Sequence, residues 1–418
     1  MVLAYKTRMT SVTEPERLRA PAIILALAGL VAPPLAVLAP LGIAPLLTLV
    51  AVALLVVMRR SLLLSAKPLL PLAALWIALA AFGLLSATWS ILPRHSLAEG
   101  GRFLAIGVEG LIALAAACWI SAREAQRVGI AAAIGVAIAV GLLVFEWATD
   151  AALTRWIHGL NSSVFINDTR YDRGVTTLVL ILWPAALALR RWRVLQIIVA
   201  GAVALAAFIM PSAASLLALL AGLAGFAVAL RAPRLVAGTL GAVLIAGAVL
   251  LPVVVPTYES TVHLQQAAPW IKGSGIHRLL IWRFAAERIA DRPLLGWGMD
   301  ASRELPGGKR DFSTTLPGIV LTPPGHDAMP LHPHDTLLQW RVELGIPGTI
   351  LGLAIIVWAL YRVGWRFGGG REAQAASLAW AATITVIALL SFGIWQEWWL
   401  SIILLTASLL AAGAADVA

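Results

Sequence analysis

Charge is scarce in this chain: Asp, Glu, Lys and Arg make up 12% of its 418 residues, whereas 60% of the residues are hydrophobic. Together with a mean hydropathy of +0.89, this composition excludes an ordinary soluble domain. The single cysteine, Cys118, excludes an intrachain disulfide and a cysteine-based zinc site. No P-loop is present, and "GWGMD" (296–300) lacks the strand–turn–helix setting of a dinucleotide site, so no motif supports a nucleotide-driven reaction.

Apolar runs long enough to cross a bilayer recur along the whole chain. A membrane helix needs roughly 20 apolar residues, and these runs lack the alternation that is typical of a membrane barrel. The sequence therefore predicts an all-α polytopic membrane protein with about twelve transmembrane helices. The expected spans are 20–39, 42–58, 68–89, 103–120, 129–149, 174–189, 194–210, 213–230, 235–254, 336–360, 375–394 and 398–414.

Basic residues are distributed unevenly between the two sides of the membrane. The short connections rich in Lys and Arg all fall on the side that carries the N-terminus, and they are 59–67, 121–127, 190–193, 231–234 and 361–372. The positive-inside rule makes that side the cytoplasm. The polar, basic start of the chain has no convincing cleavage site, so we interpret it as a cytoplasmic tail and not as a signal peptide.

The predicted organisation is a cytoplasmic tail (1–19), spans one to nine (20–254), a long extracytoplasmic loop (255–335) and spans ten to twelve (336–418). The loop contains "GIHRLLIWRFAAERIADRPLLGWGMD" (275–300), which predicts an amphipathic helix over 276–289. Arg292 and Pro293 are expected to end this helix. Arg278 and Trp282, four residues apart, share one of its faces.

A polar cluster, "LHPHDTLLQWRVELG" (331–345), stands directly in front of the tenth span. Asp335 is placed to cap the first free N–H groups of that helix. His334 then lies at the positive end of the helix dipole, which favours a neutral imidazole that accepts a proton. The same helix end attracts phosphate oxygens. A base and an anion site at one boundary suit a reaction between a hydroxyl group and a phosphate-bearing lipid.

Arginines form the second half of this hypothesis, because a guanidinium matches diphosphate oxygens better than an ammonium does. Arg278 and Arg283 lie on the expected loop helix. Arg170 and Arg173 lie in "NDTRYDRGV", at the outer end of the sixth span, where a charge near the bilayer is unfavourable unless it is paired or functional. For Arg170, snorkelling to the lipid headgroups is the alternative.

Three alternatives compete with this hypothesis. The histidines are interfacial residues that only cap and solvate, or they hold a metal ion, or the chain is a transporter. A metal site would use His326, Asp327, His332, His334 and Asp335, although neither an HExxH motif nor a cysteine pair supports it. A transporter usually has broken helices and charges at mid-membrane, whereas the charges here gather at the outer edge.

Two further segments are given simpler interpretations. Glu343 falls about two turns into the tenth span, where we expect it to be partly buried against an arginine. "FGIWQEWWL" (392–400) has the composition of an aromatic belt at the outer interface, with Glu397 in a tight turn.

The two blocks "GIHRLLIWRFAAERIADRPLLGWG" and "HPHDTLLQWRVELGIPG" resemble the paired signature of the O-antigen ligase and polymerase superfamily. In that signature an Arg-aliphatic-Trp helix leads to a Pro-Leu-Leu-Gly-x-Gly turn. A His-Pro-His-Asn segment then opens the next membrane helix, which continues to Glu-Leu-Gly. The usual Asn is Asp335 here, which still caps the helix but is expected to raise the imidazole pKa.

The resemblance implies a GT-C glycosyltransferase of the bacterial inner membrane that uses neither metal nor other cofactor. Its donor is a glycan on undecaprenyl diphosphate, and its acceptor at the periplasmic face is lipid A-core. The alternative acceptors are another repeat unit, as in an O-antigen polymerase, or a protein, as in an O-oligosaccharyltransferase. A lipid-linked glycan flippase is less favoured.

The resemblance also assigns roles to individual residues. It places the base at His334 and the diphosphate-binding arginines at Arg278 and Arg173, with inversion at the anomeric carbon. Further expected substrate-binding residues are Arg170, Arg283, Trp282, His332 and Asp335. We expect the His332 side chain to point away from His334 and to tolerate substitution better.

Overall fold

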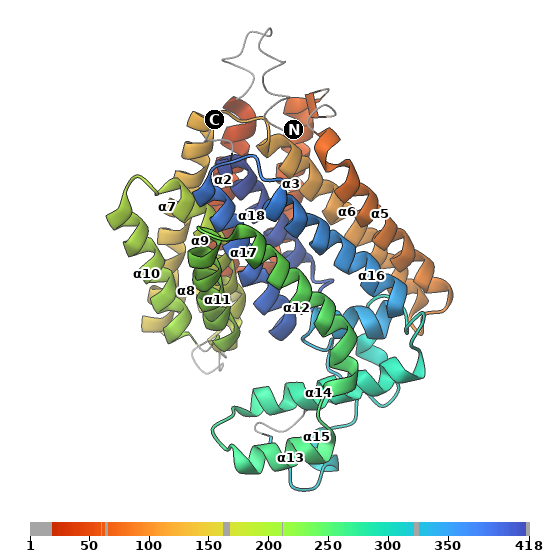
Figure 1. Ribbon diagram of the computed structural model, residues 1–418. Helices are drawn as coiled ribbons and strands as arrows, with labels where there is room; N and C mark the ends of the chain where they lie inside the picture. Colours follow the sequence, from red (N-terminus) through yellow and green to blue (C-terminus); the bar gives the residue numbers. More distant parts are fainter. Residues whose placement is uncertain are drawn as a thin grey trace.

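The computed structural model of the chain is a bundle of long helices with a smaller helical region at one end (Figure 1). It describes residues 19–59, 61–62, 66–161, 168–210, 212–321 and 326–414. Residues 1–18 of the expected tail and residues 162–167 of an expected outer loop lie outside the described residues. The described residues form no named strand, and the bridge between Asp311 and Asp327 is isolated. The prediction of an all-α fold is confirmed.

Twelve helices of the described chain follow the twelve expected spans in order. They are α2 (Arg19–Leu38), α3 (Ile43–Met58), α5 (Leu70–Leu85), α6 (Pro93–Ala117), α7 (Ala122–Ala148), α9 (Asp172–Ala188), α10 (Arg193–Ile209), α11 (Ala213–Ala229), α12 (Pro233–Val254), α16 (Thr336–Trp365), α17 (Arg371–Leu390) and α18 (Glu397–Ala414). Shorter turns are η1 (Pro40–Gly42), η2 (Lys67–Leu69), η3 (Ser86–Thr88), α8 (Ala152–His158) and η4 (Asp168–Tyr171).

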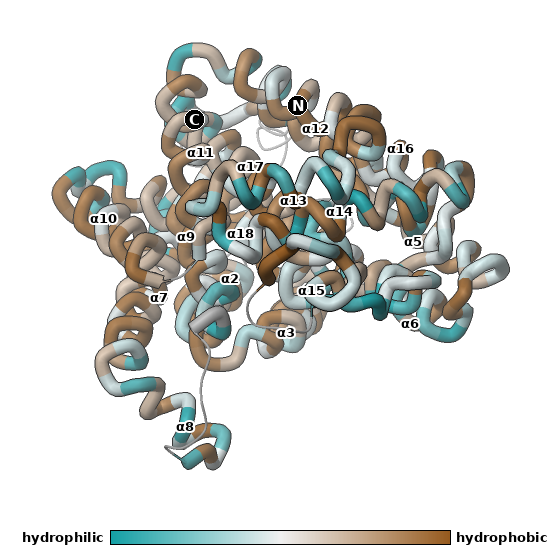
Figure 2. Tube along the Cα trace, turned by 90° about the horizontal axis from the view of Figure 1, so that it is seen from below, coloured by the Kyte–Doolittle hydropathy of each residue, from teal (hydrophilic) through white to brown (hydrophobic). Residues whose placement is uncertain are grey.

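Nine helical segments of the described chain are long and apolar enough to cross a membrane. The remaining helices of the series, α9, α10 and α11, have 17 residues each. Hydrophobic residues dominate the bundle in Figure 2, and large side chains such as Leu49, Ile197 and Phe208 are exposed on it. Such a surface suits contact with lipid. The chain is therefore a multi-pass membrane protein, while the count of twelve crossings stays a prediction.

Small residues let the membrane helices approach closely. Where α2 packs against α7, Gly29 lies against Ala132, and a Cβ atom added at Gly135 would overlap the backbone of Leu30. Interfaces of this kind bring two helix backbones together in lipid, where apolar surface alone gives little driving force for association. The glycines and alanines of α2 and α7 therefore contribute through packing.

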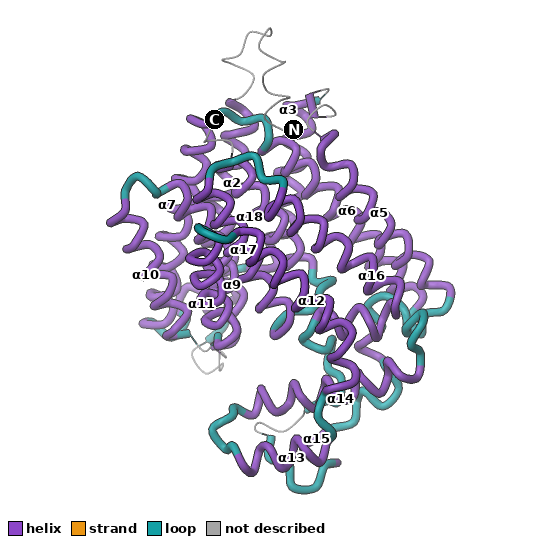
Figure 3. The backbone as a smooth tube through the Cα atoms, viewed as in Figure 1, coloured by secondary structure: helices purple, strands orange, loops and turns teal. Residues whose placement is uncertain are grey.

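The loop region (residues 255–335) contains α13 (Tyr258–Ala267), α14 (Gly273–Asp291), η5 (Ser302–Glu304) and α15 (Phe312–Thr315), joined by loops that are teal in Figure 3. The predicted helix 276–289 is present as α14, longer at both ends, and it ends before Arg292 as expected. Its apolar face forms a small core with Phe312 and with two residues of α16, Leu338 and Val342. This shared core attaches the loop region to the start of α16.

Helix α16 begins at Thr336, as predicted, but it is broken where the sequence predicted an uninterrupted span. Gly345 has φ 61° and ψ −153°, a conformation that glycine adopts without steric strain. Next to the break, the turn after α14 pairs with the helix backbone: Trp297 N–H donates to Val342 O at 2.9 Å, Gly298 N–H to Glu343 O at 2.8 Å, and Ile346 N–H to Leu294 O at 3.2 Å. The turn supplies hydrogen-bond partners that a continuous helix would supply itself.

Candidate active site

The start of α16 is fixed by a buried cap. Asp335 is 1% exposed, and its Oδ1 atom accepts a hydrogen bond from Leu338 N–H at 2.8 Å. The predicted N-cap is therefore confirmed. Burial raises the pKa of Asp335 to about 7, against the opposing effect of the helix N–H groups. Trp282 of α14 donates from Nε1 to Pro333 O at 2.9 Å, so the loop helix is tied to the segment that carries His334.

His334 is held in a single tautomer by the backbone at the end of α17. Its Nδ1 atom lies 2.6 Å from the carbonyl oxygen of Ser391. Because a carbonyl only accepts, Nδ1 carries the hydrogen and Nε2 keeps its lone pair. His334 also has φ 58°, which is uncommon for a residue with a side chain and is typical of strained functional positions. The ring therefore keeps its Nε2 lone pair for accepting a proton.

The His334 imidazole is neutral near pH 7. Burial lowers its pKa to about 4; Arg278 and His277 lower it further, and the hydrogen bond to Ser391 opposes them. The sequence predicted a neutral ring correctly, but from the helix dipole, whereas burial is the main cause. The expectation that Asp335 would raise this pKa is wrong, because the Asp335 carboxylate turns to the backbone of α16.

His332 does not point away from His334, which corrects the expectation from the sequence. The two rings have centroids 4.4 Å apart, and His332 Nδ1 accepts from His334 N–H at 3.1 Å. His332 Nε2 lies 3.1 Å from the side-chain amide nitrogen of Gln396. Burial places the pKa of His332 well below its usual range. The chain turns between the two histidines, so His332 acts as a support for the backbone of His334.

The 391–396 segment, which orients His334, is fastened to α16. Ile394 N–H donates to Gln339 Oε1 at 2.9 Å, and Trp395 Nε1 donates to Glu343 Oε2 at 2.5 Å. Gln339 Nε2 in turn donates to Glu343 Oε1 at 3.2 Å. Glu343 is 0% exposed, so the expected partial burial against an arginine is wrong: its hydrogen-bond partners in the described chain are uncharged donors.

The "FGIWQEWWL" segment is not an aromatic belt facing lipid. Trp395, Trp398 and Trp399 are buried, and Glu397 begins α18 instead of lying in a tight turn. The composition of the segment, considered without its neighbours, favoured a position at the membrane interface. The segment lies between the end of α17 and the start of α18, beside His334. These side chains therefore have neighbours on all sides.

Arg278 projects from α14 near the histidines. It lowers the pKa values of both His332 and His334, so its charge lies within electrostatic reach of both rings. Its Nη1 atom donates to Ser274 O at 3.3 Å, whereas the buried Nε atom has no hydrogen-bond partner in the described chain. Burial lowers the pKa of Arg278 itself, against the effect of Asp172. Such a guanidinium has donors left for an anionic ligand.

Arg173 lies on the membrane side of the same site, in the first turn of α9. Its guanidinium carbon is 5.6 Å from the centroid of the Trp398 ring, a cation–π distance. Within the described residues Arg173 has no ion pair. The structure thus places Arg278 of the loop region and Arg173 of the bundle around the residues that hold His334.

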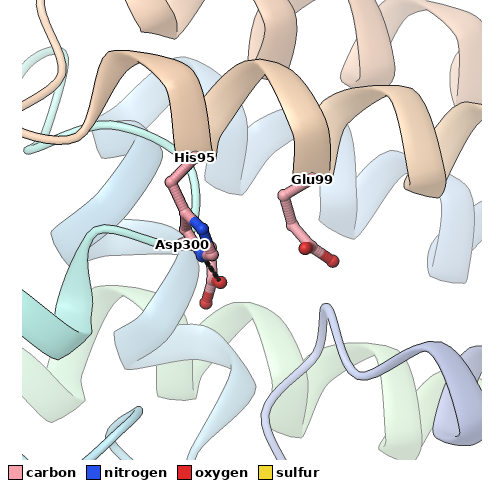
Figure 4. Close-up of side chains that lie close together, drawn as sticks. All are labelled: His95, Glu99 and Asp300. Carbon is pink, nitrogen blue, oxygen red and sulfur yellow. Dashed lines mark hydrogen bonds and ion pairs between the residues drawn. The ribbon is translucent and has the colours of Figure 1, made fainter.

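The other predicted binding residues have different surroundings. Arg283 donates from Nε to Glu287 Oε1 at 3.1 Å within α14, so its charge is partly compensated there. Arg170 is half-buried in η4, beside Tyr171. Trp282 and Asp335 have the structural contacts given above. The cluster considered as the alternative metal site, with His326 and Asp327, is not assembled in the described chain. The described group with metal-binding geometry is His95, Glu99 and Asp300 (Figure 4).

Part of this chain is similar in sequence to known proteins. Residues 202–353 match the family model described as "O-Antigen ligase". A protein named "Putative polysaccharide ligase" from Rickettsia conorii is 32% identical over 158 residues, which are 38% of this chain and 36% of the relative. One from Rickettsia felis is 28% identical over 272 residues, 64% of this chain and 63% of the relative. The matched part thus spans less than two thirds of these relatives.

Proposed function

We propose that this chain is an O-antigen ligase, and that it transfers an O-antigen glycan from undecaprenyl diphosphate to a sugar hydroxyl of lipid A-core at the periplasmic face of the inner membrane. The observation that carries the proposal is the geometry of His334. Its Nδ1 atom is taken by Ser391 O, its Nε2 atom is left to accept a proton, and burial keeps the ring neutral. A neutral base in electrostatic reach of the Arg278 guanidinium, which has an unpaired Nε donor in the described chain, suits transfer from a diphosphate.

In the proposed reaction, Nε2 of His334 takes the proton from the acceptor hydroxyl as its oxygen attacks the anomeric carbon. The bond from that carbon to the diphosphate oxygen breaks, and the attack from the opposite face inverts the configuration. The leaving diphosphate keeps the electron pair. Arg278 and Arg173 offset the negative charge that grows on it, and no step requires a metal ion.

The two arginines also account for the lipid. Arg173 lies in the first turn of a bundle helix, so a diphosphate bound there has its polyprenyl chain at the level of the bilayer. Arg278 binds the same diphosphate from the side of the loop region. The Nδ1–H···O bond and the left-handed backbone of His334 then set the Nε2 lone pair relative to the bound group.

The test combines purified protein with defined substrates. Protein in liposomes containing EDTA receives undecaprenyl-diphosphate-linked glycan and lipopolysaccharide without O-antigen. The expected result is long-chain lipopolysaccharide together with released undecaprenyl diphosphate. No transfer to lipopolysaccharide, or transfer that needs added manganese or zinc, would contradict the proposal.

Deletion of the gene separates the alternative acceptors. Loss of all long-chain lipopolysaccharide with accumulation of lipid-linked polymer identifies a ligase. A band of core plus one repeat unit identifies a polymerase, and unchanged lipopolysaccharide with lost protein glycosylation identifies an O-oligosaccharyltransferase.

A further inference from the structure

A second polar group lies at the outer end of α6, away from the arginines assigned to the donor. His95, Glu99 and Arg102 follow at intervals of four and three residues, so they share one face of this membrane helix. Glu99 and Arg102 follow the start of α6 at Pro93 by about two and two and a half turns, in front of the expected span 103–120. Ionisable residues near the bilayer are unfavourable unless they face a partner or a polar ligand.

The group is assembled with the turn that follows α14. His95 Nε2 lies 2.5 Å from Asp300 Oδ2, and Arg303 Nη2 donates to the same oxygen at 2.5 Å. Glu99 Oε2 accepts from Arg102 Nη1 at 3.2 Å. In Figure 4, His95 and Glu99 leave the same side of α6, and His95 meets Asp300 there.

One donor of this group has no partner. The buried Nε atom of Arg303 lacks a hydrogen-bond acceptor in the described part of the chain. The Glu99 side chain is only 7% exposed, and it accepts the hydrogen bond from Arg102 at Oε2. A buried guanidinium nitrogen without an acceptor is unfavourable unless a ligand or water supplies one. The group therefore has an unfilled donor position.

The start of α18 relates this group to the base. Helix α18 packs against both α6 and α9. Glu397 Oε1 forms an ion pair with Arg102 Nε of α6 at 3.2 Å, and its neighbour Trp398 lies under Arg173 of α9. The preceding residue, Gln396, contacts His332. The base is thus flanked by the diphosphate arginine on the α9 side and by the His95–Glu99–Asp300 group on the α6 side.

We propose that His95, Glu99 and Asp300, with Arg102 and Arg303, bind the hydroxyl groups of the acceptor sugar; this inference rests on the proposed function. Sugar hydroxyls both donate and accept, so they match a surface on which carboxylates and guanidinium groups alternate. The carboxylates would repel a second diphosphate. A divalent cation would meet the two arginines that already balance Glu99 and Asp300.

The acceptor that fits is the sugar part of a membrane-anchored glycolipid. Arg102 and Glu397 are about half-exposed although both lie in membrane helices, which leaves their polar atoms open along the bilayer edge. The base must lie within reach of the acceptor hydroxyl and on the face opposite the diphosphate. We place the acceptor on the α6 side because Arg303 lies within electrostatic reach of His332, and because α18 separates α6 from Arg173 of α9.

The test measures acceptor and donor kinetics separately for Glu99→Gln and His95→Ala. The acceptor is lipopolysaccharide without O-antigen, and the donor is undecaprenyl-diphosphate-linked glycan. We expect KM for the acceptor to rise on the order of 10- to 100-fold, since a charge-assisted hydrogen bond is lost, with donor KM unchanged. The matched control is Glu109→Gln, which removes a carboxylate from the same helix where it accepts from Thr48. It should leave both KM values unchanged.

A direct binding measurement makes the result independent of turnover. Binding of the same lipopolysaccharide to wild type and variants is followed in detergent, and folded protein is confirmed by size-exclusion chromatography. Weaker binding by both variants, with normal binding by Glu109→Gln, supports the inference. Acceptor KM and binding equal to wild type in both variants overturn it.

A third experiment tests whether the His95–Glu99–Asp300 group binds a divalent cation instead of a sugar. Wild-type protein is dialysed against Mn²⁺ or Zn²⁺ and its metal content is measured. No stoichiometric metal is expected. One bound ion that Glu99→Gln abolishes would replace the sugar subsite with a cation site. Failure of the wild type to transfer any glycan would reject the proposed function, and the lipopolysaccharide-binding comparison would still decide the role of this group.

Discussion

The backbone N–H of Asp300 donates to the Glu343 carboxylate at 2.7 Å and thereby joins the turn after α14 to the interior of α16. The other Glu343 oxygen accepts from Ser302 Oγ at 2.5 Å. The same carboxylate holds Trp395 and Gln339, which position the segment that orients His334. Glu343 therefore supports the proposed acceptor group and the proposed base at once.

Glu343→Gln is expected to destabilise the folded protein by about 2–4 kcal/mol. The amide offers one acceptor oxygen in place of two and brings its own N–H groups into a site that contains four donors, so buried donors lose their partners. Thermal unfolding in detergent measures the effect, with Glu109→Gln as the matched control. A melting temperature unchanged relative to that control would show that the donors find other partners.

His334→Ala is expected to lower turnover on the order of 100- to 10,000-fold while donor binding is largely kept. The base is removed, but the arginines that hold the diphosphate remain. His332→Ala should lose less, because it removes a support of the His334 backbone and not the proton acceptor. Single-turnover transfer with a defined donor provides the measurement. Near-normal turnover of His334→Ala would eliminate the proposed mechanism.

The acid limb of the pH profile should lie near pH 4. Burial lowers the His334 pKa to about 4, so the neutral base is present above that pH and is lost as the pH falls through it. An unperturbed histidine would give this limb near pH 6.5. In the unfolded chain the same ring binds its proton near pH 6.5, so this group also lowers stability as the pH falls from about 6.5 to 4.

The profile of kcat/KM against pH is compared with that of Asp335→Asn, which keeps a good helix cap without the carboxylate. Both proteins should share the limb near pH 4. A limb at pH 6 to 7 in the wild type that disappears in Asp335→Asn would assign the titration to Asp335.

Arg278→Lys is expected to impair donor binding and turnover together. An ammonium keeps the charge but does not reproduce the two-pronged contact of a guanidinium with a diphosphate. Donor KM should rise and kcat should fall, while acceptor KM is unchanged. Arg283→Lys is the control, because Arg283 already pairs with Glu287 on the same helix. Equal effects of the two substitutions would remove the specific role of Arg278.

Topology is checked with reporter fusions at Gly307 and at the C-terminus. The basic short loops predict that both termini lie in the cytoplasm and that residues 255–335 lie outside, so the two reporters should give opposite results. Figure 1 agrees in placing the loop region at the end of the bundle opposite the end of α18. Identical results would move the proposed site to the wrong side of the membrane.

Local signals explain what was predictable from the sequence. The start of α16 follows from Asp335, and the end of α14 follows from Arg292 and Pro293, because caps and prolines act within a few residues. The lengths of the apolar runs predicted the series of bundle helices. The 3.1 Å pair of Arg283 with Glu287 was also accessible, since residues four apart on a helix meet.

Long-range contacts explain what was missed. The partner of His334 is the carbonyl of Ser391, a backbone atom 57 residues away that no side-chain pattern marks. Glu343 was expected near an arginine because its partners, Ser302 and Trp395, are distant in the chain. The composition of α6 gave no reason to pair His95 with Asp300, 205 residues away. Each of these depends on how the loop region packs on α16.

The broken α16 constrains how such proteins can be recombined. The turn at Leu294–Gly298 supplies hydrogen bonds to the backbone around Gly345, so each segment completes the other. A chimaera that exchanges residues 255–335 alone would pair a foreign turn with this helix and leave those backbone groups mismatched. The crossover point that preserves the pairing lies after Ile346, so the exchangeable module is the loop together with the first turns of the following membrane helix.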